Sequence, residues 1–280
     1  MNQRLEACTK ELAENKACGI APYLTAGDGG LERTRELLMA MERAGASCVE
    51  LGVPFSDPIA DGPVLQAAAQ RALAGGTTLA GILECVTRYR SDGGQLPIAL
   101  FSYANPLLGL GSGDLENAWR EACGRIAAAG LDGVLVPDLP IEEGAALRQA
   151  AGENGLCPIF FVSPTTSEER LARAAEWSRG FLYAIGRTGI TGGKTALGPE
   201  TRAFLDRVSE ASAVPVGVGF GLRDADQVRA VADHAQLAIV GSALVAHIHE
   251  AASASPDRAH ENAVTAAEQF VTDLKRGTLR

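Results

Sequence analysis

The feature that most constrains the fold is a regular alternation of short apolar runs with amphipathic segments along the whole chain. Strands that are apolar throughout are covered on both faces, and strands that alternate with helices form parallel sheets. Eight apolar runs occur, at residues 20–24, 48–52, 98–101, 133–136, 158–162, 181–185, 214–218 and 237–240. Helical patterns lie between them at residues 31–44, 79–90, 115–129, 145–153, 168–177, 201–211 and 225–232. The chain is therefore predicted to form a parallel sheet covered by helices.

Eight strand and helix units in 280 residues match a (β/α)8 TIM barrel, which usually has about 250 residues. Two further helices are predicted at the ends of the chain, over residues 3–14 and 259–275. No long linker or change in composition divides the chain, so we predict an α/β fold with one barrel domain over residues 1–280. An open, doubly wound sheet is the alternative.

The charge balance restricts the partners. A net charge of -9, without a local cluster of Lys and Arg, argues against binding to nucleic acid or to an anionic membrane. An anionic substrate would then be held by backbone amides. No apolar stretch has the length of a signal-peptide core or a membrane span, so a cytoplasmic protein is expected.

The six cysteines do not suggest a metal or redox centre. They are scattered singly, with no CxxC pair and no histidine at metal-ligand spacing. They are predicted to be buried, small apolar side chains, and no metal site is expected.

Two acidic residues stand where a barrel enzyme has its active site, after a strand. Glu50 lies near the end of the apolar run 48–52, and Asp61 lies in the loop that follows. An unpaired charge among apolar residues costs several kcal/mol in order of magnitude, so this strand is expected to end at a ligand site. Apolar surroundings also raise the pKa of a carboxyl group, as general acid-base chemistry requires.

Each acid also has a structural interpretation. Glu50 could form an ion pair at the rim of the barrel, and Asp61 belongs to an Asp-Gly-Pro turn signal. Turn or helix-cap hydrogen bonding is the default for three other acids in loops after strands, Asp28, Asp57 and Asp138.

Glycine-rich loops follow the sixth, seventh and eighth apolar runs, at residues 186–193, 219–221 and 241–242. Barrels often bind phosphate at these loops, where glycine lets backbone N–H groups approach the oxygens. The amides of Gly192, Gly221, Gly241 and Ser242 are predicted to do so. Residues 186–198 could form a mobile lid. Ordinary strand-to-helix turns are the alternative.

No nucleophile is apparent. The four histidines, His234, His247, His249 and His260, lie in the C-terminal helical part, away from the loops that follow strands. This disfavours Ser-His and Cys-His chemistry. Lys16 and Lys194 are outside the apolar runs, which disfavours a lysine Schiff base.

Residues 49–63, Val-Glu-Leu-Gly-Val-Pro-Phe-Ser-Asp-Pro-Ile-Ala-Asp-Gly-Pro, resemble the signature of the tryptophan synthase alpha subunit family. Further matching segments are residues 23–28, 103–106, 138–140, 189–192, 219–221 and 241–243, so the resemblance covers nearly the whole chain. It implies a TIM barrel that cleaves indole-3-glycerol phosphate to indole and glyceraldehyde 3-phosphate. This retro-aldol reaction needs no cofactor of the subunit's own.

The resemblance also implies roles for individual residues. Glu50 would put a proton on indole C3 and take one from the glycerol hydroxyl, while Asp61 would accept a hydrogen bond from the indole N–H. Tyr183 would orient Glu50, and Thr191 would close the lid by bonding to Asp61. The phosphate would lie on Gly192, Gly221, Gly241 and Ser242. Tyr23, Phe101, Leu135, Ile159 and Phe220 resemble the wall around the indole ring, although each taken alone also fits plain barrel core.

The family usually pairs with a beta subunit that carries pyridoxal phosphate, in an alpha-beta heterotetramer, and residues 53–63 and 105–106 resemble the contact surface. Related proteins without this partner are free-standing lyases. Two other functions stay open: a non-catalytic, phosphate-binding regulatory subunit, and a different phosphate-binding barrel such as a sugar-phosphate isomerase or epimerase. The second would share the glycines but not residues 49–63.

Overall fold

The computed structural model describes residues 4–186, 197–219 and 221–278. Its nine strands form one parallel sheet in the order β5-β4-β3-β2-β1-β9-β8-β7-β6. The strands are β1 (Gly19–Thr25), β2 (Val49–Gly52), β3 (Ile98–Phe101), β4 (Gly133–Leu135), β5 (Cys157–Ile159), β6 (Phe161–Val162), β7 (Leu182–Ile185), β8 (Val216–Gly219) and β9 (Leu237–Val240). Each predicted strand lies within two residues of an observed one.

The fifth predicted strand, residues 158–162, is divided into β5 and β6 at Phe160. The Phe160 N–H donates to Ser178 Oγ at 3.2 Å, whereas its carbonyl oxygen accepts from the Tyr183 N–H at 3.0 Å. β5 pairs with β4, and β6 pairs with β7. The two ends of the sheet are therefore halves of one barrel strand, and the sheet closes into the predicted TIM barrel.

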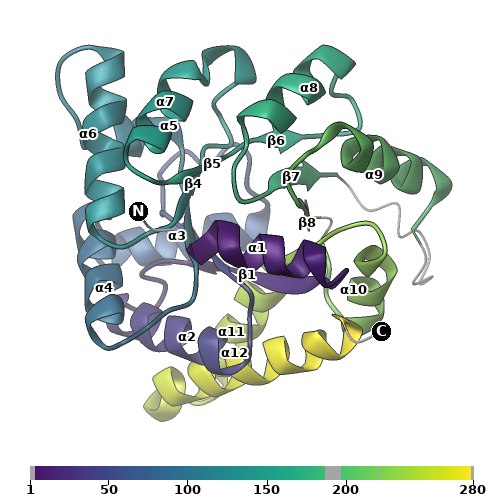
Figure 1. Cartoon of the computed structure of the whole chain (residues 1–280). Helices are drawn as coiled ribbons and strands as arrows, with labels where there is room; N and C mark the ends of the chain where they lie inside the picture. Colours follow the sequence, from purple (N-terminus) through teal and green to yellow (C-terminus); the bar gives the residue numbers. More distant parts are fainter. Residues whose placement is uncertain (1–3, 187–196, 220, 279–280) are drawn as a thin grey trace.

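Helices surround this sheet (Figure 1). They are α1 (Arg4–Glu14), α2 (Leu31–Arg43), α3 (Pro63–Ala74), α4 (Leu79–Ser91), α5 (Ala104–Leu108), α6 (Leu115–Ala128), α7 (Ala145–Glu153), α8 (Glu168–Trp177), α9 (Pro199–Ala211), α10 (Ala225–Ala232), α11 (Ser242–Ala254) and α12 (Ala259–Lys275). Three short 3-10 helices are η1 (Ile141–Glu143), η2 (Pro256–Arg258) and η3 (Arg276–Thr278). All nine predicted helices are present, within two residues at the ends that the structure describes.

Three helices were not predicted from the periodicity: α3, α5 and α11. α5 has only five residues, which is too short for a periodic pattern. α11 is weakly amphipathic because it packs against several elements at once, namely α12, α3 and β1. Its apolar residues therefore do not form one narrow stripe.

α1 lies across one end of the barrel (Figure 1). Its Leu5 is fully buried in the interior cluster with Cys157 and Phe181. Arg4 Nε lies 3.0 Å from Oδ1 of buried Asp132, whose Oδ2 lies 2.9 Å from Arg90 Nη2. Because Asp132 directly precedes β4, this closed end is the amino end of the strands. The carboxyl end is left for a site.

The cysteines agree with the prediction except at one position. Five are buried, and Cys8 is partly exposed because it lies on α1, where its thiol donates to the Ser47 carbonyl oxygen. Within the described ranges, no helix combines the length and the apolar character needed to cross a membrane.

Candidate active site

A cavity of about 580 Å³ opens at the carboxyl ends of the strands. Residues from most strands and from the loops after them contribute to its wall. The lining consists of Tyr23, Glu50, Ala60, Asp61, Gly62, Leu65, Phe101, Pro137, Phe161, Tyr183, Ile185, Gly186, Gly219, Gly221, Ile239, Gly241 and Ser242. The fold thus brings the two predicted acids to one cavity.

Glu50 is a buried carboxyl group without a described partner. It pairs in register with Tyr23 on β1 and Ala99 on β3, and the residue is 1% exposed. Oε1 has no hydrogen-bond partner, and no ion pair involves Glu50, among the residues that the structure describes. Burial raises the pKa of Glu50 from 4.5 to about 8. The rim ion pair considered from the sequence is therefore not found in the described part of the chain, and the raised pKa favours the protonated carboxyl group at neutral pH.

Asp61 is half-buried at the cavity mouth. Its backbone N–H donates to the Pro58 carbonyl oxygen at 3.1 Å, as in a turn, while the residue also lines the cavity. Burial raises the pKa of Asp61, and a hydrogen bond from the Tyr103 hydroxyl opposes that increase. Asp61 is thus both a turn residue and an acid directed to the site.

Two tyrosines of the cavity wall fit against glycines at strand ends. An added Cβ at Gly52 would lie 2.0 Å from the Tyr23 hydroxyl oxygen, and one at Gly219 would lie 2.6 Å from the Tyr183 hydroxyl oxygen. Tyr23 packs edge-on against Phe101, with 5.6 Å between ring centroids. Burial raises the pKa of Tyr183 well above its ordinary value. These glycines make room for aromatic side chains. From the sequence, glycines after strands were considered only as residues whose backbone amides could bind phosphate.

We expect Gly52→Ala to displace Tyr23, because the new methyl group cannot share space with the phenol. Such overpacking typically lowers the free energy of unfolding by about 1–3 kcal/mol. Urea denaturation measures the change. Gly152→Ala is the matched control: this glycine lies in α7 with no atom within 4 Å of an added Cβ, and alanine there should keep or slightly raise stability. Equal stability of the two variants would contradict the tight fit at Gly52.

The N-terminus of α11 faces the same cavity. Gly241 is the N-cap and Ser242 the first residue of this 13-residue helix, and both line the cavity. Glycine has no side chain to accept from the first-turn N–H groups, and no side-chain cap is described there. These N–H groups and the helix dipole favour an anion. Gly221 also lines the cavity, whereas Gly192 lies outside the described residues.

The family model for the tryptophan synthase alpha chain matches residues 9–278. This chain belongs to the tryptophan synthase alpha chain family. The tryptophan synthase alpha chain of Alkalilimnicola ehrlichii is 47% identical over 248 residues, which cover 89% of this chain and 86% of that protein.

Solved structures of tryptophan synthase have the same fold. Subunit alpha from Legionella pneumophila is similar with a TM-score of 0.86 and 32% identity, covering 99% of this chain and 98% of that one. A chain from the a2b2 complex of the hyperthermophile Pyrococcus furiosus gives a TM-score of 0.81 and 32% identity, covering 92% and 98% respectively. The fold and family predicted from the sequence are therefore confirmed.

Only some of the residues expected around the indole ring line this cavity. Tyr23 and Phe101 line the cavity, but Leu135 and Ile159 do not. These two are buried in the interior cluster of the barrel, as the alternative core interpretation has it. Phe161, two residues after Ile159, lines the cavity instead. Phe220 and Thr191 lie outside the described residues.

Several lining residues were missed from the sequence. Besides Phe161, they include Leu65 on α3, Pro137 in the loop after β4, Ile185 at the end of β7 and Ile239 on β9. Phe161 and Ile185 lie near the ends of predicted apolar runs. Because the cavity opens at the carboxyl ends of the strands, this position could have indicated that they line it. Nothing local distinguishes Leu65 or Ile239 from core residues.

The other acids of the loops in this alpha chain have structural roles. Asp28 forms a two-pronged ion pair with Arg71, with distances of 2.8 and 2.6 Å, instead of the expected turn or cap bond. Asp138 Oδ1 accepts from the Ala104 N–H at the start of α5, as expected for a cap. Asp57 is exposed.

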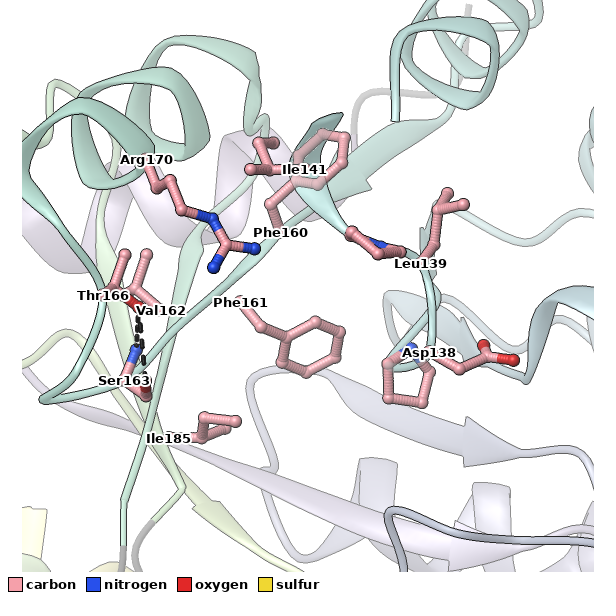
Figure 2. A pocket seen from close by; sticks show the side chains of 12 residues that line it. Asp138, Leu139, Ile141, Phe160, Phe161, Val162, Ser163, Thr166, Arg170 and Ile185 are labelled. Carbon is pink, nitrogen blue, oxygen red and sulfur yellow. Dashed lines mark hydrogen bonds between the residues drawn. The ribbon is translucent and has the colours of Figure 1, made fainter. Parts of the chain in front are cut away.

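A second cavity of about 300 Å³ adjoins the first. Figure 2 shows Phe161 at its centre and Asp138 at one side, with the carboxylate turned away from that ring. Pro137, Phe161 and Ile185 line both cavities. The two cavities therefore share one part of their lining.

The four histidines lie on or beside the outer helices α10, α11 and α12. In the part of the chain that the structure describes, no three His, Cys, Asp or Glu residues form a group that could hold a metal ion.

Proposed function

We propose that this alpha chain is a carbon-carbon lyase that cleaves indole-3-glycerol phosphate to indole and glyceraldehyde 3-phosphate. The observation that carries the proposal is the buried Glu50, which has no ion-pair partner among the described residues and a raised pKa, in one cavity with Asp61. Protonating an aromatic carbon requires a desolvated acid that holds its proton at neutral pH. Membership of the family supports the same reaction.

The reaction balances with these two residues. Protonated Glu50 gives its proton to indole C3, which makes a cationic indolenine. Asp61 accepts a hydrogen bond from the ring N–H and stabilises the positive charge. The carboxylate of Glu50 then takes the proton of the hydroxyl on the glycerol carbon that is bonded to C3. The bond between C3 and this carbon breaks, and its electron pair returns to the ring. Indole and the aldehyde leave, Glu50 is protonated again, and no metal or cofactor enters the scheme.

The remaining lining residues suit the two ends of this substrate. The first turn of α11, with Gly241, Ser242 and nearby Gly221, would hold the phosphate through backbone N–H groups. Tyr23, Phe101 and Phe161 would flank the bicyclic ring, and Tyr183 would orient Glu50. The proposal also includes Thr191 and Gly192, whose roles rest on the family resemblance.

We further propose that a tryptophan synthase beta subunit is the partner, with pyridoxal phosphate on that subunit, in the cytoplasm. The similar Pyrococcus furiosus chain comes from an a2b2 complex. Ile59 in the loop between β2 and α3 is 82% exposed, and this loop is the surface that the resemblance implies for the contact.

Indole formation by the purified chain, with and without a beta subunit, tests both proposals. Indole release that rises on mixing would support a lyase within a complex. A high rate that mixing does not change would replace the complex with a free-standing lyase. Binding of a phosphate ligand without any indole release would contradict the lyase and favour a regulatory subunit.

We expect Ile59→Asp to weaken binding of the beta subunit about 10-fold, because a carboxylate in place of an apolar side chain loses its hydration when the contact forms. Isothermal titration calorimetry measures the affinity. The rate of the isolated variant should stay within 2-fold of the isolated parent (~0.4 kcal/mol), because Ile59 lies outside the cavity. Leu73→Asp on α3 is the matched control, since Leu73 is also a partly exposed apolar residue. Equal affinities for the two variants would exclude Ile59 from the interface.

A further inference from the structure

Tyr103 joins the barrel to the loop that carries Asp61. It directly precedes α5, is separated from β3 by Ser102 alone, and is 2% exposed. Its hydroxyl oxygen accepts from the Ala60 N–H at 2.9 Å, and the hydroxyl donates to the Asp61 carboxylate. Its ring packs on Phe55, with 5.3 Å between centroids. One side chain therefore contacts this loop at three residues, Phe55, Ala60 and Asp61.

The loop itself has little internal structure. Residues 53–62 lie between β2 and α3, and Ser56, Asp57, Ile59 and Ala60 are exposed. Its described internal backbone bonds are two, from Ile59 to Asp57 and from Asp61 to Pro58. The loop therefore depends on outside contacts for its shape.

Tyr103, by contrast, is held on a rigid support. Ser102 Oγ donates to the Tyr103 carbonyl oxygen at 3.0 Å, and Asp138 accepts from the next N–H, that of Ala104, at 2.9 Å. The ordinary bonds of β3 fix the backbone below it. A buried group with fixed surroundings can define the direction of the carboxylate that it binds.

We propose that Tyr103 is a positioning residue for Asp61, whose carboxylate it directs to the ring N–H of the substrate. Tyr103 is not among the residues that line the cavity, so it acts through Asp61 rather than on the substrate. An ionised carboxylate has about four acceptor sites, which lets Asp61 accept from Tyr103 and from the indole at the same time. This inference rests on the lyase function proposed above.

The charge of Asp61 also depends on this contact. Burial raises the pKa of Asp61, and the Tyr103 hydrogen bond lowers it. The other titratable groups that act at this place are Tyr23, Glu50 and Asp138. Without the hydroxyl, the pKa of Asp61 rises further, and less of the residue is ionised at a given pH.

Tyr103→Phe tests the inference because it keeps the ring, its burial and the Phe55 contact. We expect kcat for cleavage of indole-3-glycerol phosphate to fall about 10- to 100-fold with a smaller change in KM, since a misplaced catalytic group can lose about that much. The acid limb of the profile of kcat/KM against pH should move to higher pH. In an Asp61→Asn background, Tyr103→Phe should have no further effect on the rate.

Tyr89→Phe is the matched control. The Tyr89 hydroxyl likewise accepts from one backbone N–H, that of Leu96 at 3.1 Å, and donates to one carboxylate, that of Glu42. It lies before β3, away from the cavity. Tyr89→Phe should lose comparable stability but keep the parent rate and pH profile. Tyr103→Phe with a rate within 2-fold and an unmoved acid limb would overturn the inference.

A measurement without turnover separates this inference from the lyase proposal. Carbon-13 NMR titration of the Asp61 carboxyl group should show a higher pKa in Tyr103→Phe than in the parent. Absence of indole release by the parent would sink the proposed lyase function, whereas an unmoved Asp61 titration would sink the role of Tyr103.

Discussion

Glu50→Gln should abolish indole release and at the same time raise the free energy of unfolding. The amide fills the space of the carboxyl group but cannot donate its proton to carbon, and loss of a general acid typically lowers a rate by about 10²- to 10⁴-fold. Binding of a phosphate ligand at the first turn of α11 should survive, because Glu50 lies elsewhere in the cavity wall.

The gain in stability follows from the pKa of Glu50. Between 4.5 and about 8, the folded chain keeps this proton while the unfolded chain has lost it. The free energy of unfolding of the parent therefore falls by ~1.4 kcal/mol per pH unit as pH rises through this window. Above the window, this contribution no longer changes with pH. Glu50→Gln removes this slope, and at pH 7 it should be more stable by on the order of 3 kcal/mol.

Urea denaturation at several pH values and an indole assay measure both effects. Glu210→Gln, at an exposed glutamate of α9, is the control and should change neither. Activity of Glu50→Gln within a few-fold of the parent would exclude Glu50 as the proton donor. The parent's kcat/KM should also decrease as pH rises through about 8, where the free enzyme loses the Glu50 proton.

Asp61→Asn should reduce turnover about as severely as Glu50→Gln. Asparagine keeps an oxygen for the indole N–H but lacks the charge that stabilises the indolenine cation. Loss of one such stabilising group typically lowers kcat by about 10²- to 10³-fold. The fold should tolerate the change, because burial already disfavours the ionised form of Asp61.

Steady-state kinetics with Asp57→Asn as control measures this effect. Asp57 is an exposed acid of the same loop, and it does not line the cavity. Its replacement should leave the isolated chain's rate near that of the parent. If Asp61→Asn turned over as fast as Asp57→Asn, Asp61 would be a turn residue only.

The sequence predicted the barrel because its strands are buried on both faces. Such strands are continuous apolar runs, as in residues 98–101 and 237–240, where predicted and observed bounds agree. Prediction was poorer where an element lacks a simple pattern of apolar residues. α11 packs on three elements and was missed, and the strand at residues 158–162 was not seen to divide at Phe160, where Ser178 takes the backbone N–H.

The candidate site was predicted in its chemistry more than in its geometry. Glu50 was recognisable because a charge within an apolar run is unfavourable unless something requires it. Its lack of a partner within residues 4–186, 197–219 and 221–278 was not recognisable, since only the fold decides which Lys or Arg can reach it. Leu135, Ile159 and Phe161 are all apolar residues of inner strands, and their depth in the barrel alone separates core from cavity wall.

By itself, then, the sequence determined the order of strands and helices, the acids and glycines at strand ends, and the family, because these depend on residue type and spacing along the chain. Tertiary structure alone decided that no described residue pairs with Glu50, that Tyr103 holds Asp61, and that Gly52 makes room for Tyr23. Each of these contacts joins residues from different strands or loops. The closing of the sheet sets the distances between them, and no local pattern records those distances.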